Sequence, residues 1–251
     1  MLKLRSLTFN IAFYVNLIVL MILGLPTILF GRHAIFALAR IWGGSSLWLL
    51  RIICGLRVEF RGLENIPKGG YIIASKHQSM LETFSLLFHA PDFAYVLKRE
   101  LTYIPFFGWY LIGAEQIAID RAAGRSALSV LSERAGAVLR AGRQIFIFPE
   151  GTRRPPGAPT QYKFGVVKLY EDTGAPCLPV AVNTGLFWGR RGFSRRPGVA
   201  VIEYLPVIAP GLDRDRFMET LEARIEAACA RLNREATAKD PALGGALAAA
   251  G

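Results

Sequence analysis

The chain has 251 residues, 52% of them hydrophobic, which is enough for one sizeable domain or one domain with an appendage. Its mean hydropathy of +0.33 is too apolar for an ordinary soluble domain. Lys and Arg outnumber Asp and Glu by 30 to 19, so the formal charge is +11 and favours polyanionic partners. Because no nucleic-acid-binding motif accompanies this charge, we expect no nucleic-acid partner. A basic and apolar chain is instead typical of a protein at a membrane surface.

The cysteines and the glycine pattern argue against a bound metal or nucleotide. Cys54, Cys177 and Cys229 are odd in number, far apart, and lack any metal-ligand spacing. They are typical of packing residues in a reducing compartment. The sequence has no Gly-rich nucleotide loop and no His/Cys/Asp/Glu cluster. We therefore expect no metal and no resident cofactor.

Residues 1–55 form a hydrophobic segment that we expect to be two membrane-associated helices. Residues 8–31 contain no charged side chain before Arg32 and are long enough to cross a bilayer core. A second apolar stretch, 34–56, is interrupted by Arg40 and Arg51. The pattern fits a single span, a helical hairpin that enters and leaves one leaflet, or a pair of core helices without lipid contact. Basic residues flank both ends, so the charge pattern gives no orientation.

Strand and helix patterns alternate over residues 56–235. The expected strands are 57–62, 71–74, 94–97, 116–119, 144–148, 177–183 and 198–205, and the expected helices are 80–89, 126–141, 163–173 and 213–234. This alternation predicts an α/β domain with a mainly parallel central sheet and helices on both faces. From residue 236 onward Ala, Gly and Pro dominate, and we expect a flexible tail over residues 236–251.

A histidine and a carboxylate follow the expected strand 71–74, in the stretch Ser-Lys-His-Gln-Ser-Met-Leu-Glu-Thr-Phe at residues 75–84. A carboxylate that keeps one imidazole nitrogen protonated leaves the other free to take a proton from a hydroxyl group. Two helical residues five positions apart lie roughly 140° apart around the axis. The pair can therefore meet only if His77 lies in the turn before the helix and Glu82 in its first turns. Alone, this spacing more often marks a helix cap followed by an exposed glutamate.

Three further segments accompany this pair. They are Gly-Ala-Glu-Gln-Ile-Ala-Ile-Asp-Arg at 113–121, Phe-Pro-Glu-Gly-Thr-Arg-Arg at 148–154 and Leu-Pro-Val-Ala-Val at 178–182. In this order, the four blocks resemble those of the glycerolipid acyltransferases, specifically the bacterial 1-acyl-glycerol-3-phosphate acyltransferases. The resemblance covers roughly residues 60–210, and the 148–153 block is its most specific part. The family usually has Asp at the position of Glu82, so the longer side chain requires a more distant ring or a different start of the helix.

The resemblance implies acyl transfer from acyl-CoA or acyl carrier protein to the sn-2 hydroxyl of lysophosphatidic acid. His77 would be the general base and Glu82 would fix its tautomer. No Ser or Cys nucleophile with a nearby base is apparent, which also favours direct attack by the alcohol. Guanidinium and ammonium groups suit a phosphomonoester, and Lys98, Arg121 and Arg153 each follow an expected strand.

By the same resemblance, Arg121 and the Glu150, Gly151, Thr152 and Arg153 block bind the acceptor. Gly151 allows close backbone approach, and Glu150 would orient Arg153 or accept a hydrogen bond from a glycerol hydroxyl. We expect Lys76 and Arg154 to be solvated surface charges. The aromatic stretch 103–110 is interpreted either as core packing or as the lining of an acyl-chain path.

The expected location also follows from the resemblance. Acyl-CoA and acyl carrier protein are cytosolic, which implies a catalytic domain on the cytoplasmic side of the bacterial inner membrane and favours the leaflet-inserted hairpin. Two alternatives stay open. One is an acyltransferase for another lyso-lipid, such as a lyso-aminolipid without an acceptor phosphate. The other is a membrane-surface binding protein that has lost catalysis, for which Glu82 is the only support.

Overall fold

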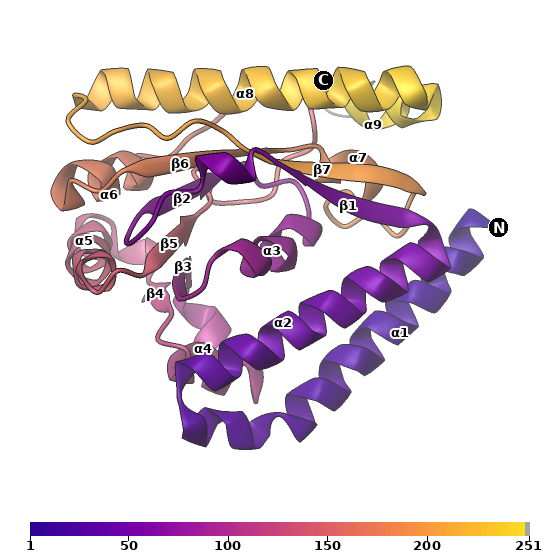
Figure 1. Ribbon diagram of the computed structural model, residues 1–251, viewed down its shortest axis with the longest axis horizontal. Coiled ribbons are helices and arrows are strands. Elements are labelled where there is room, and N and C mark those ends of the chain that lie inside the picture. The colour runs from indigo at the N-terminus through magenta and orange to yellow at the C-terminus, as the bar shows by residue number, and fades with distance from the viewer. Residues whose placement is uncertain (249–251) are drawn as a thin grey trace.

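A seven-stranded sheet of order β1-β7-β6-β2-β5-β3-β4 runs through the molecule (Figure 1). The computed structural model describes residues 1–248, apart from the side chains of Arg121, Arg125 and Ala248. The strands are β1 Leu56–Arg61, β2 Ile72–Ser75, β3 Phe93–Lys98, β4 Ile117–Ile119, β5 Gln144–Ile147, β6 Cys177–Val182 and β7 Gly198–Tyr204. The helices are α1 Leu2–Leu23, α2 Arg32–Leu49, α3 Leu81–Ser85, α4 Phe107–Gly113, α5 Arg125–Arg140, α6 Gly165–Thr173, α7 Thr184–Phe187, α8 Arg214–Lys239 and α9 Gly245–Ala248.

The sheet is parallel at every pairing except that of β6 with β7. Strands β2, β5 and β6 are buried along their whole length, because helices cover both faces of the sheet. Helices α5, α6 and α8 pack on one face, and α1, α2 and α3 on the other (Figure 1). The predicted α/β fold with a mainly parallel, doubly covered sheet is confirmed. The expected helix 80–89 is shorter than predicted, since α3 gives way to a 3-10 turn at Leu86–His89.

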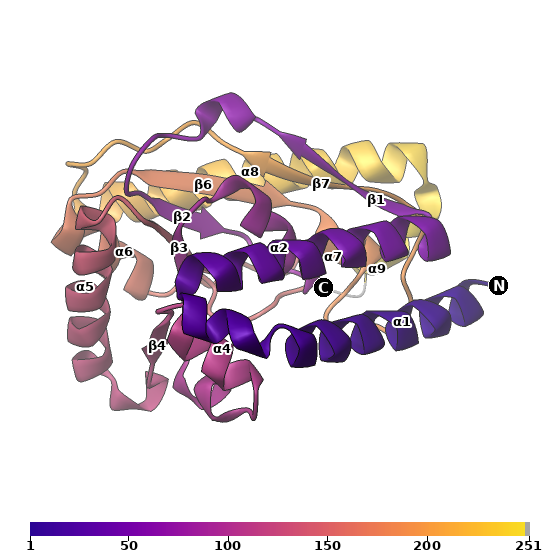
Figure 2. The same ribbon diagram turned by 60° about the horizontal axis from the view of Figure 1, so that its bottom comes forward.

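The N-terminal segment is a helical hairpin whose inner side belongs to the core of the domain. A 3-10 turn, Leu25–Phe30, joins α1 to α2, and the two helices lie side by side along the molecule (Figure 2). The ring of Phe13 contacts those of Phe84 and Trp188, with centroids 6.0 and 5.7 Å away. Asn16 Nδ2 donates to Ser45 Oγ at 2.8 Å and joins the two helices by a polar contact. The two predicted helices are confirmed, and the hairpin is part of the folded unit.

The C-terminal residues are more ordered than their composition suggested. Helix α8 continues to Lys239, and a 3-10 turn at Pro241–Gly244 follows it. The Asp240 side chain caps this turn by accepting from the Ala242 N–H, and Leu243 is buried against the core shared with the hairpin. Residues 236–248, where a flexible tail was expected, thus form helical turns that pack against the core through Leu243. Residues 249–251 lie outside the described residues.

Candidate active site

His77 and Glu82 meet at the carboxyl end of β2. The strand ends at Ser75, the chain passes through an irregular turn, and α3 begins at Leu81 with Glu82 in its first turn. The Nδ1 atom of His77 lies 2.9 Å from Oε1 of Glu82. This is the arrangement that the spacing required, with the histidine before the helix and the acid on its first turn. The longer glutamate reaches the ring because the helix starts only one residue before it.

The carboxylate of Glu82 is held by donors on every side. Its Oε1 also accepts the backbone N–H groups of Gln78 at 2.8 Å and Ser79 at 2.6 Å, and its Oε2 accepts the hydroxyl of Thr184 at 2.7 Å. Glu82 is completely buried. An ionised carboxylate can only accept, so we assign the imidazole proton to Nδ1 of His77 and the free lone pair to Nε2. These contacts thus fix both the position and the tautomer of the imidazole.

An aromatic ring fixes the orientation of the imidazole. Phe148 stacks on His77 with a centroid distance of 3.9 Å and an interplanar angle of 17°. Tyr95, from β3, continues the stack beyond Phe148 at 6.1 Å. Stacking on one face and the Glu82 contact at one edge leave the ring little freedom to rotate.

Strand order explains why the separate motif segments converge. Strands β6, β2 and β5 are adjacent and parallel, so their carboxyl ends lie at one edge of the sheet. The segment after β5 binds to His77 directly: the Arg154 N–H donates to the His77 carbonyl at 2.8 Å, and the His77 N–H donates to Glu150 Oε2 at 3.5 Å. Thr184 follows β6 and reaches Glu82 from the other side. The 148–154 block is therefore fastened to the histidine at two points.

Lys76 is buried, so the prediction of a solvated surface charge is wrong. Its Nζ lies 2.9 Å from Glu150 Oε1 and 2.7 Å from Glu226 Oε1, and Tyr162 donates to the same Glu226 oxygen at 2.9 Å. Successive side chains of an extended segment point to opposite faces. His77 therefore turns toward α3, and Lys76 turns toward α8, where Glu226 is located.

Charges within this network shift one another's pKa values. Burial raises the pKa of Glu150, and the ammonium of Lys76 opposes that shift without cancelling it. Burial also disfavours the charge of Lys76, but Glu150 and Glu226 outweigh it, so the pKa of Lys76 is raised. The ammonium form of Lys76 is therefore favoured beneath the loop that carries His77, with Glu150 on one side and Glu226 on the other.

The partners of Glu150 differ from those expected. Its carboxylate contacts Lys76 and lies 3.9 Å from Nε of Arg154, with no contact to Arg153 among the described residues. Arg154 is half-buried and also donates to Gln161 Oε1 at 3.0 Å, so the prediction of a free surface charge is wrong here too.

The remaining predicted residues of the 148–154 block line its outer side. Gly151 has a φ of 66°, a conformation that a residue with a Cβ rarely adopts. Thr152 is exposed, and Arg153 is half-buried with its carbonyl accepting from Arg190 at 3.0 Å. Within the described part of the chain, the Arg153 guanidinium has no ion-pair partner. It is therefore available for an anionic ligand.

Lys98 and Arg121 lie further along the sheet edge. Lys98 ends β3, is exposed, and makes no ion pair with any described residue. Arg121 begins the 3-10 turn Arg121–Ala123 after β4, but its side chain lies outside the described residues. Strands β3 and β4 follow β5 in the sheet, so these positions are one and two strands beyond the 148–154 block. The structure thus gathers His77, Glu82 and Glu150 tightly and places these two residues at the periphery.

Sequence reasoning missed several residues of this site. Thr184 holds the second oxygen of Glu82, and its only sequence signal is its position directly after an expected strand. Glu226 and Tyr162 hold Lys76, and no sequence pattern marked either of them. No group of three or more His, Cys, Asp or Glu side chains within residues 1–248 is arranged to hold a metal ion.

Comparisons with known proteins agree on one family. A family model described as Acyltransferase matches residues 57–183. A 1-acyl-sn-glycerol-3-phosphate acyltransferase of Pseudomonas aeruginosa is 40% identical over 186 residues, which cover 74% of this chain and 72% of that protein. A chloroplastic enzyme of the same name from Arabidopsis thaliana is 30% identical, and the match covers 76% of this chain and 54% of that protein.

A solved structure shares the fold. The crystal structure of the 1-acyl-sn-glycerophosphate acyltransferase from Thermotoga maritima superposes with a TM-score of 0.76. The match covers 92% of this chain and 98% of that one, at 24% sequence identity. At this identity the similarity establishes the overall fold.

Proposed function

This chain belongs to the acyltransferase family, and from that premise we propose that it acylates the sn-2 hydroxyl of lysophosphatidic acid to give phosphatidic acid. The observation that carries the proposal is the 2.9 Å contact between Nδ1 of His77 and the buried carboxylate of Glu82. A base of this kind suits proton removal from an alcohol. The acyl donor is a thioester of coenzyme A or of acyl carrier protein. The reaction is a step of phospholipid biosynthesis.

The proposed mechanism uses direct attack. The acceptor oxygen forms a bond to the thioester carbonyl carbon as its proton passes to Nε2 of His77. Glu82 stabilises the imidazolium that results. Collapse of the tetrahedral intermediate breaks the carbon–sulfur bond, and the departing sulfur takes the proton from the imidazolium. The base is thereby regenerated without an acyl-enzyme.

We assign acceptor binding to the cations around this dyad. Arg153, whose guanidinium lacks an ion-pair partner in the described part of the chain, is the nearest in the strand order, and Lys98 and Arg121 follow along the sheet edge. The backbone at Gly151 and Thr152 offers close approach to a phosphate. Glu150 acts with Lys76 in positioning the loop, since both are buried together beneath His77.

We propose that the hairpin lies in one leaflet with the catalytic domain on the cytoplasmic side of the bacterial inner membrane. Helix α1, and helix α2 with its continuation to Cys54, are long and apolar enough to cross a membrane by length and composition. However, α2 is fastened lengthwise to the domain: Arg32 binds Asp92 at 3.1 Å, and Arg40 donates to the carbonyls of Leu87 at 3.1 Å and Ala90 at 2.8 Å. A hairpin held along the domain favours insertion from one side.

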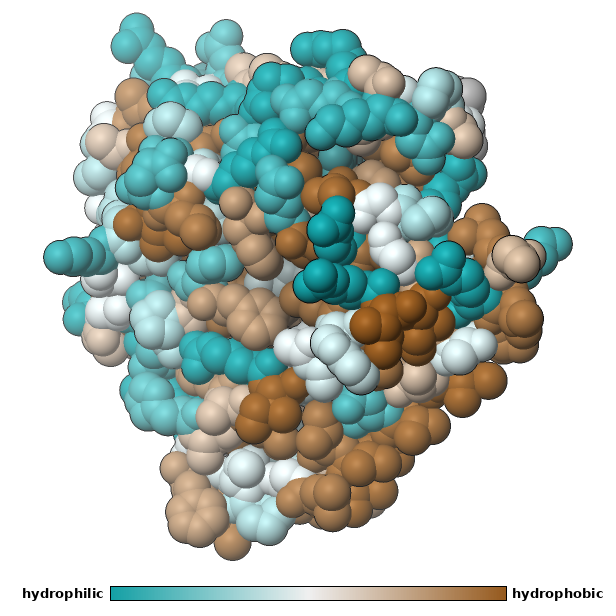
Figure 3. Space-filling view, turned by 45° about the vertical axis from the view of Figure 1, so that its right-hand side comes forward, coloured by the Kyte–Doolittle hydropathy of each residue, from teal (hydrophilic) through white to brown (hydrophobic). Residues whose placement is uncertain are grey.

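The outer side of α1 supports this placement. Large apolar side chains at helical spacing are exposed along its whole length, and a leaflet would cover them. These residues are Leu4, Leu7, Ile11, Tyr14, Val15, Ile18, Val19, Ile22 and Leu23. Figure 3 shows hydrophobic side chains gathered along the lower right of that view, where the hairpin lies.

The activity is tested with purified full-length protein, labelled acyl-CoA or acyl carrier protein, and a panel of lyso-lipids. Transfer to lysophosphatidic acid is expected, and His77→Ala should abolish it while leaving the circular dichroism spectrum unchanged. Transfer only to another lyso-lipid, such as a lyso-aminolipid, would replace the proposed acceptor. No transfer to any acceptor would favour a catalytically inactive binding protein.

Membrane topology is tested separately. High salt should fail to release the protein, because apolar burial dominates its attachment. A cysteine placed beside Lys3 should resist membrane-impermeant thiol reagents added outside intact cells. Labelling there would place the N-terminus across the bilayer and contradict the one-leaflet hairpin.

A further inference from the structure

Most large side chains of the segment 103–112 lie on the surface, whereas Tyr110 is buried in the core. Tyr103 exposes 68% of its area, Trp109 51% and Ile112 64%, and the rings of Phe106 and Trp109 contact each other with centroids 5.0 Å apart. Core packing therefore does not account for these side chains. Single exposed apolar residues are ordinary, but an exposed cluster within ten residues indicates an interaction surface.

The backbone of this segment is strained in a way that maintains the exposure. Phe106 has a φ of 62° and a ψ of −56°, and the Phe107 N–H donates to the Pro105 carbonyl at 2.7 Å, which forms a γ-turn of the rare positive-φ type. Bulky residues seldom adopt a positive φ. Strained backbone conformations of this kind are concentrated at binding and functional sites. Here the turn holds a phenylalanine ring at the surface beside Trp109.

The segment is built onto the hairpin turn. The Tyr110 hydroxyl donates to the Met21 carbonyl at the end of α1 at 2.6 Å. Gly113 permits close contact with α2, since a Cβ there would lie 2.9 Å from Cδ1 of Ile35. The turn of the hairpin exposes Leu29 by 86% and Phe30 by 77%. Figures 1 and 2 show α4 beside this turn, so the two apolar surfaces are neighbours.

We propose that residues 103–112 are a second lipid-contacting surface, which enters the same leaflet as the hairpin turn. This inference rests on the proposed membrane placement of the hairpin and extends it to the catalytic domain. Its occupant is the interfacial layer of a phospholipid bilayer, because aromatic rings favour that depth and the surface continues that of the hairpin. Lys98, exposed just before the segment, suits the anionic headgroups of the same layer.

The placement has a consequence for the acceptor. The segment lies in the chain between Lys98 at the end of β3 and Arg121 after β4. When residues 103–112 enter the membrane–water interface, the carboxyl ends of β3 and β4 lie at the depth of the lipid phosphates. A lysophospholipid can then keep its acyl chain in the leaflet while its phosphate meets these cations. The surface therefore aligns the acceptor with the catalytic edge.

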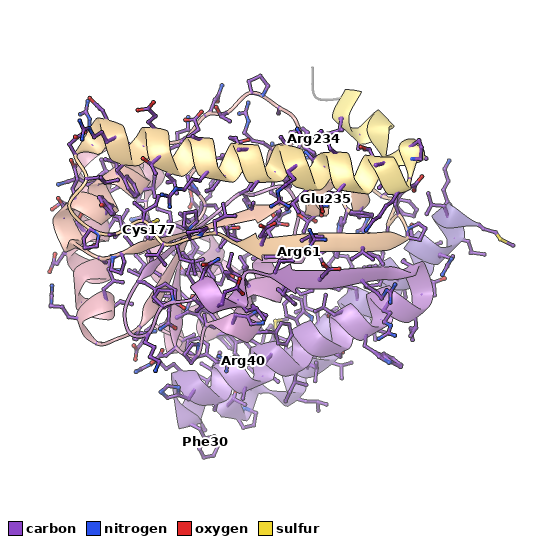
Figure 4. All side chains as sticks on the ribbon, turned by 45° about the horizontal axis from the view of Figure 1, so that its top comes forward. Phe30, Arg40, Arg61, Cys177, Arg234 and Glu235 are labelled. Carbon is purple, nitrogen blue, oxygen red and sulfur yellow. The ribbon has the colours of Figure 1, made fainter. Side chains whose placement is uncertain are left out.

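Single cysteines carrying an environment-sensitive fluorophore test the proposal in the full-length protein. The three native cysteines are buried, so labelling is directed to the introduced thiol. The test variant is Trp109→Cys, with Ile112→Cys as a second position on the same surface. Phe30→Cys reports the hairpin turn, and Arg234→Cys on α8 is the aqueous control. Figure 4 shows these last two residues on opposite sides of the molecule.

Each labelled protein is reconstituted into vesicles of phosphatidylcholine with an anionic phospholipid. The fluorescence of the label is then quenched either by iodide in the water or by nitroxides on the lipid acyl chains. We expect labels at 30, 109 and 112 to be quenched several-fold more by lipid nitroxides than by iodide, and the label at 234 to show the reverse. Iodide quenching at 109 and 112 with lipid quenching at 30 would overturn this proposal alone. Iodide quenching at 30 as well would overturn the membrane placement and this proposal together.

A double variant links the surface to function. Phe106→Ser with Trp109→Ser should lower turnover of long-chain lysophosphatidic acid in vesicles by about tenfold and leave turnover of a dispersed short-chain acceptor unchanged. Arg234→Ser, a surface change on α8, should alter neither rate. An equal loss on both acceptors would mean that the segment supports the fold, and no loss on either would mean that it contributes nothing to acceptor delivery. Both results contradict the proposal.

Discussion

Replacing Glu82 by glutamine removes a negative charge beside His77 while preserving the shape of the side chain. The N–H groups of Gln78 and Ser79 both donate to Oε1, so they select the amide carbonyl oxygen at that position. The amide nitrogen then faces the Thr184 hydroxyl, which can rotate to accept from it. Nδ1 of the imidazole still finds an acceptor, so the tautomer survives. The variant therefore isolates the effect of charge.

Coulomb attraction sets the size of that effect. The imidazolium formed during proton transfer lies about 4 Å from the carboxylate, and at an effective dielectric constant of about 20 the attraction is about 4 kcal/mol. Each 1.36 kcal/mol corresponds to about a factor of ten in rate, so kcat should fall about 10³-fold in Glu82→Gln. Glu82→Asp keeps the charge but is one methylene shorter, and it should lose less activity than the glutamine variant.

The assay is steady-state acyl transfer to lysophosphatidic acid by purified variants whose thermal unfolding and near-ultraviolet circular dichroism match those of the wild type. The loss should fall on kcat and kcat/KM alike, because the charge acts only when the imidazolium forms. Turnover by Glu82→Gln within a few-fold of the wild-type rate would refute the dyad. A loss confined to KM would instead assign Glu82 to acceptor binding.

Three further predictions concern charged side chains, two at the candidate site and one beside the hairpin. Lys76→Met should lower the free energy of denaturant unfolding by about 3–5 kcal/mol, because it leaves the buried carboxylate of Glu150 without its ion-pair partner. Adding Glu150→Gln should recover part of this loss. An unchanged denaturation midpoint in Lys76→Met would contradict the buried ion pair. Arg153→Ala should raise KM for lysophosphatidic acid far more than KM for the acyl donor, whereas equal effects would remove Arg153 from acceptor binding. Burial disfavours the charge of Asp92, but Arg32 and Arg143 together outweigh it and lower the pKa of Asp92 below 3.8. This contribution to stability is therefore present above pH 3.8 and is lost as the pH falls through the lower folded-state pKa. Asp92→Asn should accordingly be less stable than the wild type at pH 7 and should match it at the acid end, and a pH-independent difference would refute the linkage.

Local patterns in the sequence predicted most of the elements. Apolar runs marked the buried strands β2, β5 and β6, because a strand covered on both faces must be apolar throughout. Turn geometry alone required His77 to precede the helix and Glu82 to begin it. These are short-range properties, so residues close in the chain decide them.

Composition misled where a few distant contacts decide the outcome. The Ala- and Gly-rich segment after residue 236 was expected to be flexible, yet Leu243 anchors it in the core. Lys76 was expected in water, yet Glu226 meets it 150 positions further along the chain. In both cases the sequence around one contact partner gives no indication of the other.

The sequence by itself indicated the candidate reacting groups and determined the alternation of strands and helices and the apolar character of the first 55 residues, because each depends on residue type and short-range spacing. Only the tertiary structure decided which strand ends are neighbours, that Thr184 completes the support of Glu82, and that the aromatic segment 103–112 faces outward beside the hairpin turn. The physical reason is that strand order, burial of charge and surface exposure are set by packing among residues far apart in the chain. The sequence around a hydrophobic residue is the same whether another element covers that residue or leaves it exposed to solvent.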